Sequence, residues 1–139
     1  MIKPKKLQFG DTIAIIGASG AVRVEGAVGR AVEYAKSLGF NVKLGESANA
    51  KYGYLSGSDE LRARDVNAMF ADPEVKAIVS TRGGYGTMRM LDLLDYDLIR
   101  ANPKVFIGFS DITAMHIAFA QRCGFITFHG PMATSWNAM

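Results

Sequence analysis

The chain of 139 residues has the length of one domain or of part of a larger one. Hydrophobic residues make up 49% and charged residues 21%, a mixture that excludes a disordered, collagen-like or coiled-coil chain. The net charge of +3 is small and the basic residues are scattered, so we do not expect a nucleic-acid-binding face.

Apolar runs and cysteine usage bear on the location of the protein. The longest apolar runs are far shorter than the roughly 20 residues that span a bilayer, and no signal peptide is visible after the first lysines. The single cysteine, Cys123, cannot form an internal disulfide, and no metal-ligand spacing occurs. We therefore expect a soluble cytoplasmic protein that binds neither a membrane nor a metal.

Strand-like and helix-like segments alternate along the chain, with glycine, Asp-Pro or Asn-Pro at the joints. The apolar runs predict five strands, at 12–17, 41–44, 75–80, 105–109 and 125–128. Helical spacing predicts helices at about 24–38, at 58–71 with Ser58 as N-cap, after Gly86 with Met88, Leu91 and Leu94 facing inward, and at about 111–123. No complete element is expected after Phe128.

This alternation predicts an α/β fold with three layers, a doubly wound parallel sheet between helices. Five strands suit the flavodoxin-like order 2-1-3-4-5, in which the third strand lies between the first and the fourth. The loops after strands one, three and four would then line one crevice, where ligands of such sheets bind.

Ser110 is the first candidate for chemistry, in the sequence Gly-Phe-Ser-Asp-Ile-Thr at 108–113. A serine on a tight turn from strand to helix exposes its hydroxyl, and the amide of Asp111 could donate to a developing oxyanion. The motif matches only half of the usual G-x-S-x-G pattern. Serine is also a favoured helix N-cap, so both interpretations stay open.

The second candidate is the loop Arg-Gly-Gly-Tyr-Gly at 82–86. Its glycines let the backbone approach a ligand and can present free amides, and Arg82 can pair with a carboxylate. A flexible turn with a surface arginine is the alternative. His116 is expected to be a packing or surface residue. For His129 we expect a structural hydrogen bond, with a contact to substrate as the alternative.

Six motifs in the same order resemble the LD-carboxypeptidase family of serine peptidases. They are Lys-Pro at 3–4 with Gly-Asp-Thr-Ile at 10–13, Tyr-Gly-Tyr-Leu-Ser-Gly at 52–57, 70–78, Arg-Gly-Gly-Tyr-Gly at 82–86, 108–113, and Phe-His-Gly-Pro-Met at 128–132. One departure is at 17–19, where the family commonly has Ala-Pro-Ser and this chain has Gly-Ala-Ser.

The resemblance implies an enzyme that removes the terminal D-alanine from murein tetrapeptides during cell-wall recycling. Such enzymes use a Ser-Glu-His triad without metal or cofactor, have a flavodoxin-like N-terminal domain and a β-rich C-terminal domain, and usually pair as homodimers. The nucleophile falls on Ser110 and the oxyanion amides on Asp111 and Gly84. Arg82, Gly83 and Tyr85 fall on the substrate side.

The family's glutamate and histidine lie in the C-terminal domain, which is absent from residues 1–139. The chain is therefore predicted to be the N-terminal, nucleophile-bearing domain, inactive alone, with an exposed apolar face at about 128–136. Two alternatives stay open. One is an amide hydrolase of the microcin C immunity type, and the other is a non-catalytic flavodoxin-like module whose glycine loop holds a small anion.

Overall fold

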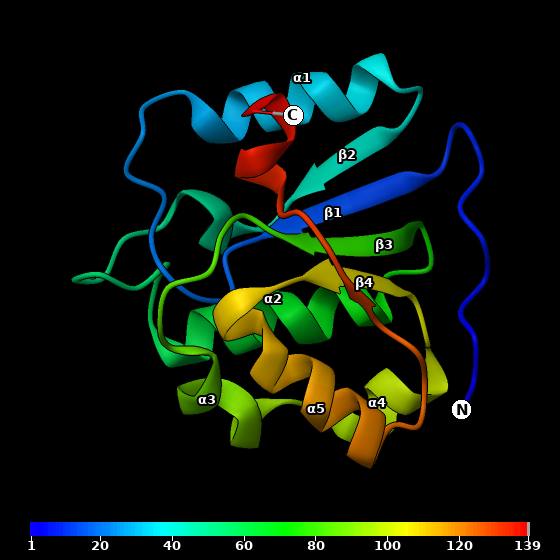
Figure 1. The fold of residues 1–139 in the computed structure, drawn as a ribbon. Helices are drawn as coiled ribbons and strands as arrows, with labels where there is room; N and C mark the ends of the chain where they lie inside the picture. Colours follow the sequence, from blue (N-terminus) through cyan, green and yellow to red (C-terminus); the bar gives the residue numbers. More distant parts are fainter. Residues whose placement is uncertain (139) are drawn as a thin grey trace.

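The computed structural model describes residues 1–138, with side chains described as far as Trp136, and has three layers (Figure 1). Five parallel strands form the central sheet in the order β2-β1-β3-β4-β5, so the predicted flavodoxin-like order is confirmed. The strands are β1 (Thr12–Ile16), β2 (Asn41–Leu44), β3 (Val75–Ser80), β4 (Val105–Gly108) and β5 (Phe128–His129).

Helices cover both faces of this sheet (Figure 1). Helix α1 and the short 3-10 helix η4 lie on one face, and α2 to α5 lie on the other. The α-helices are α1 (Ala27–Ser37), α2 (Asp59–Ala71), α3 (Thr87–Met90), α4 (Tyr96–Ala101) and α5 (Thr113–Arg122); the 3-10 turns are η1 (Glu46–Asn49), η2 (Leu91–Leu93), η3 (Ser110–Ile112) and η4 (Ala133–Ala138). As predicted, Ser58 caps α2, because its hydroxyl accepts a hydrogen bond from the amide of Leu61 at 3.1 Å.

Strand β1 supplies side chains to both cores, since successive residues of a strand point to opposite faces. Ile13 and Ile15 belong to the core beneath α1, whereas Ala14 and Ile16 belong to the larger core beneath α2. This double burial explains why β1 is apolar at nearly every position.

Four phenylalanines form the centre of the larger core: Phe70, Phe106, Phe119 and Phe125 are all fully buried. Phe119 lies edge-on to Phe106, with ring centroids 5.0 Å apart, and 5.6 Å from Phe125. Edge-to-face pairs of this kind add to the free energy gained by burying the rings.

Two sequence predictions in the second half of the chain were wrong in detail. The connection between β3 and β4 is not one helix but consists of α3, η2 and α4. The 3-10 turn interrupts the α-helical spacing, so the buried positions differ from those predicted for one continuous helix. Met88 is therefore 64% exposed, and Met90 is buried in its place. The fifth strand covers only Phe128 and His129, while Phe125 forms an isolated bridge with Ile2 near the N-terminus.

The expected apolar face at about 128–136 is only partly exposed. Phe128 is exposed, but Met132 is buried in the larger core, and Ala133 is buried in the core beneath α1, onto which η4 packs. Trp136 is half-buried, and its ring centroid lies 6.0 Å from that of Tyr34. Much of the apolar surface predicted at this end is thus covered by α1.

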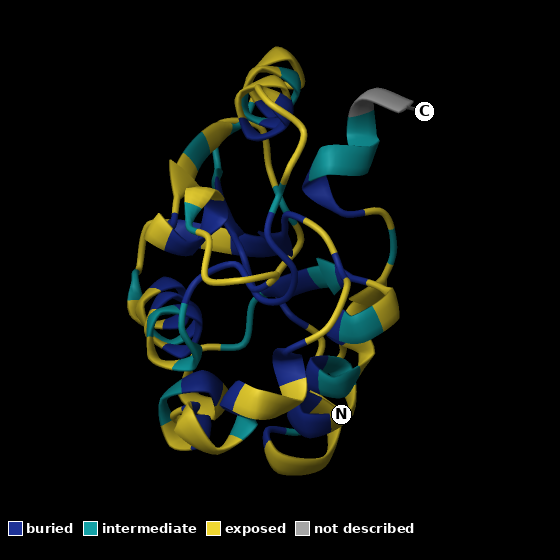
Figure 2. Cartoon of the chain, turned by 90° about the vertical axis from the view of Figure 1, so that its left-hand side faces the viewer, coloured by how far each residue is buried: buried dark blue, intermediate teal, exposed yellow. Residues whose placement is uncertain are grey.

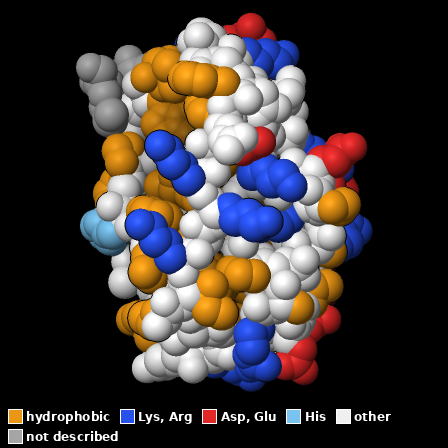
Figure 3. Space-filling model, turned by 90° about the vertical axis from the view of Figure 1, so that its right-hand side faces the viewer, with side chains coloured by type: hydrophobic (Ala, Val, Ile, Leu, Met, Phe, Trp, Pro, Cys, Tyr) orange, Lys and Arg blue, Asp and Glu red, His pale blue; other side chains and the backbone are white. Residues whose placement is uncertain are grey.

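The two edges of the sheet present different surfaces. Figure 2 faces the carboxyl ends of the strands, and shows buried segments at the centre with exposed loops around them. Figure 3 shows the opposite edge, where lysine and arginine side chains lie among apolar ones. Within residues 1–138 no helix combines the length and the apolar character that crossing a membrane requires.

The phenylalanine core generates a stability prediction. Phe119→Ala should lower the free energy of unfolding by about 3–5 kcal/mol, because it removes a fully buried ring and leaves a cavity. Ile117→Ala is the matched control on the same helix, since Ile117 is 53% exposed and should lose much less. Urea denaturation followed by circular dichroism measures both, and equal losses would contradict this account of the core.

His116 joins α5 to the sheet through both ring nitrogens. Nε2 lies 2.8 Å from the carbonyl oxygen of Gly108, and Nδ1 lies 2.7 Å from Oγ1 of Thr127. A carbonyl only accepts, so Nε2 carries the proton and Nδ1 accepts from the threonine hydroxyl. Burial lowers the pKa of His116; the hydrogen bond to Gly108 opposes this shift, and the nearby His129 adds to it.

This lowered pKa predicts how stability depends on pH. Between the folded pKa and the unfolded value of about 6.5, the unfolded chain binds more protons, so stability falls as the pH drops through this window. His116→Gln removes that titration. Urea denaturation at about pH 8 and about pH 5 should show a smaller loss for the variant than for the wild type. An identical loss in both proteins would rule out His116 as the source.

Candidate functional site

The loops that follow β1, β3 and β4 meet at one edge of the sheet, because these strands are neighbours in the order β1-β3-β4. A hydrogen bond from the amide of Gly20 to the carbonyl of Gly83, at 3.1 Å, joins the first two loops directly. The loops after β1 and β3 are therefore in direct contact.

Ser110 lies in the loop after β4, at the start of η3, with an exposed side chain. Its φ is 59°, which makes it the one non-glycine residue with positive φ among those that the structure describes. A serine in this left-handed conformation costs about 1–3 kcal/mol, which the surrounding contacts must offset. Such residues cluster at functional sites, where a sharp turn must present one side chain.

The helix-capping interpretation of Ser110 was wrong. Phe109, in extended conformation, holds the N-cap position of η3, and no side-chain capping bond is formed there. Gly108 permits the turn, because a Cβ at this position would lie 2.5 Å from Cγ2 of Ile112. The first turn of the following helix thus packs directly against the end of β4.

The glycine loop touches the serine. A Cβ built on Gly83 would lie 3.1 Å from Cβ and 3.3 Å from Oγ of Ser110, so only glycine leaves the hydroxyl uncrowded. Gly84 and Gly86 have φ of 121° and 129°, which other residues rarely adopt. For the amides of Gly83 and Gly84, the described part of the chain supplies no backbone acceptor.

Arg82 and Tyr85 flank this loop and are both exposed. The guanidinium of Arg82 donates from Nε to the carbonyl of Gly83 at 3.1 Å and from Nη1 to the carbonyl of Ala21 at 3.2 Å. It therefore braces the loop in addition to any contact with a ligand. The ring of Tyr85 lies beside that of Tyr54, with centroids 6.0 Å apart.

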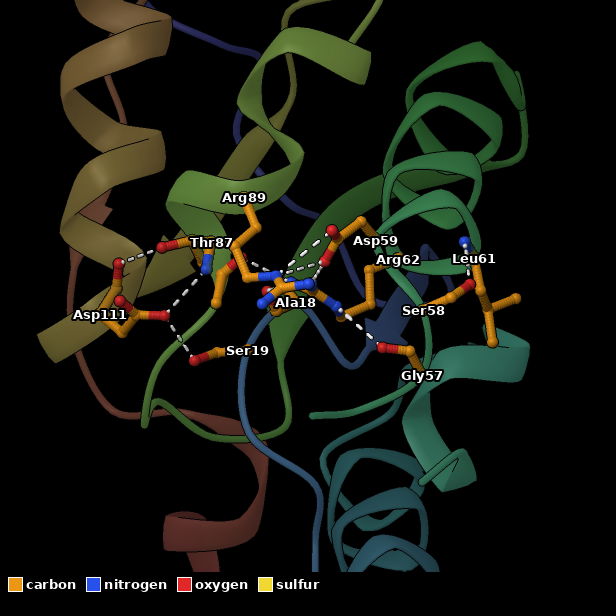
Figure 4. Close-up of polar contacts among 11 residues, drawn as sticks. Ala18, Ser19, Gly57, Ser58, Asp59, Leu61, Arg62, Thr87, Arg89 and Asp111 are labelled. Atoms are coloured by element: carbon orange, nitrogen blue, oxygen red, sulfur yellow. Dashed lines mark hydrogen bonds and ion pairs between the residues drawn. The ribbon is translucent and has the colours of Figure 1, made fainter. Parts of the chain in front are cut away.

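Asp111 directs its carboxylate toward Ser19 and Thr87, in the loops that follow β1 and β3 (Figure 4). Oδ2 accepts a hydrogen bond from Oγ of Ser19 at 2.6 Å and another from the amide of Thr87 at 3.1 Å. The carbonyl of Asp111 also accepts from Oγ1 of Thr87 at 2.7 Å. The residue that follows Ser110 thus ties its turn to the other two loops.

Sequence reasoning missed Arg62, which is completely buried on α2. Its guanidinium donates to three carbonyls, at 3.1 Å to Ala18, 2.8 Å to Gly86 and 3.2 Å to Gly57, and forms an ion pair with Asp59. The only signal available was the Asp-x-x-Arg spacing at 59–62, which is common on exposed helices.

A second network of buried hydrogen bonds fixes the loop that follows β1. Both the amide and the hydroxyl of Ser47 donate to the buried carboxylate of Asp65, the amide at 2.8 Å. The hydroxyl oxygen in turn accepts from the amide of Gly17 at 3.0 Å. This links β1 to α2 through η1, a connection that no sequence motif indicated.

The two histidines lie near the end of β4 but do not bond to Ser110. The nitrogens of His116 are occupied by Gly108 and Thr127, as a packing residue should be. His129 is exposed, with its ring centroid 6.0 Å from that of Phe109. Among the described residues its ring nitrogens have no hydrogen-bond partner, contrary to expectation. Within the described part of the chain, no cluster of three metal-ligating side chains occurs.

The sequence and the structure of the chain were compared with those of known proteins. A protein of Bacillus subtilis named probable murein peptide carboxypeptidase is 42% identical over 133 residues, which is 96% of this chain and 41% of that protein. The crystal structure of an MccF-like protein from Bacillus anthracis superposes with a TM-score of 0.92 at 39% identity, covering 97% of this chain and 42% of the other.

A further solved structure is the microcin C7 self-immunity protein MccF in complex with aspartyl sulfamoyl adenosine. It superposes with a TM-score of 0.88 at 36% identity, covering 94% of this chain and 40% of that one. The chain thus spans about two-fifths of the length of these proteins. The family model described as the LD-carboxypeptidase N-terminal domain matches residues 13–130. Because this match covers most of its length, the chain belongs to the LD-carboxypeptidase family.

Proposed function

We propose that the chain is the nucleophile-bearing N-terminal half of a serine LD-carboxypeptidase, which releases the terminal D-alanine from murein tetrapeptides in cell-wall recycling. The observation that carries this proposal is the left-handed, exposed Ser110 in contact with Gly83. The B. subtilis relative, named a murein peptide carboxypeptidase, supports the choice of substrate class.

In this proposal Oγ of Ser110 attacks the carbonyl carbon of the scissile amide. A base takes the hydroxyl proton and later gives a proton to the leaving amine of D-alanine. The acyl-enzyme that remains is hydrolysed by water, which returns Ser110 to its free form. The amides of Asp111 and Gly84 are the proposed donors to the oxyanion. Arg82, Gly83 and Tyr85 are the proposed contacts to the substrate.

Among the described residues, no base forms a hydrogen bond with the hydroxyl of Ser110. The carboxylate of Asp111 already accepts from Ser19 and Thr87, and the ring nitrogens of His116 are occupied. We therefore propose that a C-terminal domain provides the glutamate and histidine, and that residues 1–139 alone do not turn over substrate. Assembly as a homodimer and a cytoplasmic location belong to the same proposal.

An amide hydrolase of the microcin C immunity type is the second candidate, because MccF superposes on the chain with a TM-score of 0.88. Both candidates use the same serine and differ in the acyl group that they accept. Turnover of a murein tetrapeptide compared with that of aspartyl sulfamoyl adenosine separates them, since each predicts a preference for its own substrate. A non-catalytic module, the third possibility, would turn over neither.

Ser110→Ala should lower kcat/KM of the full-length protein that contains this chain by at least about a thousandfold, because the nucleophile is lost. Ser37→Ala is the control, since the hydroxyl of Ser37 is exposed and bonds only to the carbonyl of Tyr34 within α1. Release of D-alanine is the measurement. Turnover by residues 1–139 alone that disappears in Ser110→Ala would contradict the assignment of the base to another domain.

Gly83→Ala should reduce kcat/KM by roughly tenfold or more, because the new methyl group crowds Oγ of Ser110 from 3.3 Å. The backbone of Gly83 is outside the positive-φ region, so the variant is expected to fold. Gly29→Ala is the matched control, because a Cβ at Gly29 meets nothing within 4 Å. If both variants keep wild-type kinetics, Gly83 is not close to the reacting hydroxyl in the working enzyme.

A further inference from the structure

The peptide group between Gly86 and Thr87 bonds to two side chains of opposite charge, Arg62 and Asp111. Its carbonyl accepts a hydrogen bond from Nη1 of Arg62 at 2.8 Å, and its amide donates to Oδ2 of Asp111 at 3.1 Å. Because a peptide group is planar and rigid, these two bonds fix its orientation from both ends. The negative end of its dipole faces the guanidinium, and the positive end faces the carboxylate.

The loop after β1 is held by the same two side chains. The carbonyl of Ala18 accepts from Nη1 of Arg62 at 3.1 Å, and Oγ of the next residue, Ser19, donates to Oδ2 of Asp111 at 2.6 Å. Two neighbouring loops therefore span the gap between one buried cation and one carboxylate. We call Arg62, Asp111 and the two dipeptides 18–19 and 86–87 the loop clamp.

Arg62 is the fixed end of the loop clamp. It is fully buried, its Nε donates to the carbonyl of Gly57, and its Nη2 pairs with Asp59. Asp59 is itself held by Nε of Arg89 at 3.0 Å, and this hydrogen bond keeps the pKa of Asp59 below its usual range. A buried cation is tolerated only where its donors find partners, and the planar guanidinium reaches several partners at once.

Asp111 is the end that meets the nucleophile, because it follows Ser110 directly in the chain. The left-handed backbone of Ser110 persists only if the surrounding contacts hold it. The carboxylate of Asp111 anchors the turn from one side, and that carboxylate is in turn oriented by Thr87 and Ser19. Arg62 thus acts on the serine through one peptide group and one carboxylate.

We propose that Arg62 is a positioning residue for Ser110, which holds the Gly86–Thr87 peptide and through it Asp111 and the nucleophilic turn. The inference rests on the proposed role of Ser110 in catalysis. Lysine cannot replace Arg62, because an ammonium group has three donors on one nitrogen, whereas the guanidinium serves three carbonyls and Asp59 from three nitrogens.

The test compares Arg62→Lys and Arg62→Met with Arg64→Met as the matched control. Arg64 lies on the same helix, but it is exposed and pairs only with the exposed Glu46. The first measurement is amide hydrogen exchange by NMR on residues 1–139, with Ile15 in the buried β1 as the internal reference. The second is kcat and KM of the full-length protein at a temperature where every variant is folded by circular dichroism.

In the Arg62 variants, exchange at Thr87 should accelerate about tenfold or more beyond any change at Ile15. The value of kcat should fall about tenfold to a hundredfold with KM within about threefold, because a displaced nucleophile slows chemistry more than binding. Arg64→Met should match the wild type in both measurements. If Arg62→Met fails to fold, Arg62→Lys decides both questions.

The proposal is overturned if a folded Arg62 variant keeps wild-type exchange at Thr87 or wild-type kcat. It is also overturned if Thr87 and Ile15 accelerate equally, since that indicates a general loss of stability. A wild-type protein that releases no D-alanine refutes the proposed function instead. In that case the comparison of Thr87 with Ile15 still shows whether Arg62 holds this peptide.

Discussion

The backbone of Ser110 has a positive φ, which residues other than glycine rarely adopt. The contacts at the carboxyl ends of the strands hold Ser110 in this conformation. β4 ends at Gly108, where the missing Cβ lets Ile112 close in behind the turn. Asp111 then ties the turn to the loops after β1 and β3. The strained residue is thus held by contacts from three segments that lie far apart in the sequence.

The sheet order makes this convergence possible. With β3 between β1 and β4, the loops after all three strands leave the same edge and touch one another. The charged groups that join them, Arg62 and Asp111, come from elements on one side of the sheet, below β3 in Figure 1. The site is therefore built on the larger core, whose four phenylalanines keep α2 and α5 in place.

Much of this could be predicted from the sequence, for physical reasons. Strands buried on both faces are apolar throughout, so β1, β3 and β4 were visible in the sequence. Their order could only be inferred from a fold type that five such strands suit. The position of Ser110 between an apolar strand and an amphipathic helix located the turn. Arg62 could not be found in this way, because an arginine on a helix is ordinarily exposed, and only the carbonyls of distant loops make its burial favourable. Two further features could not be predicted, namely the exposure of Met88 and the packing of η4 against α1. Both depend on tertiary contacts of short 3-10 turns, which have no clear sequence pattern.

One carboxylate oxygen, Oδ2 of Asp111, serves both Ser19 and Thr87. This shared acceptor joins two loops whose bonding residues are 68 positions apart, at 19 and 87. Position 19 can change without penalty only to a residue that returns a hydroxyl, such as threonine, because a carboxylate left with one donor is no longer oriented. Position 87 donates to the same oxygen through its backbone amide, which every residue except proline carries, so for this acceptor the constraint on side-chain identity falls on position 19.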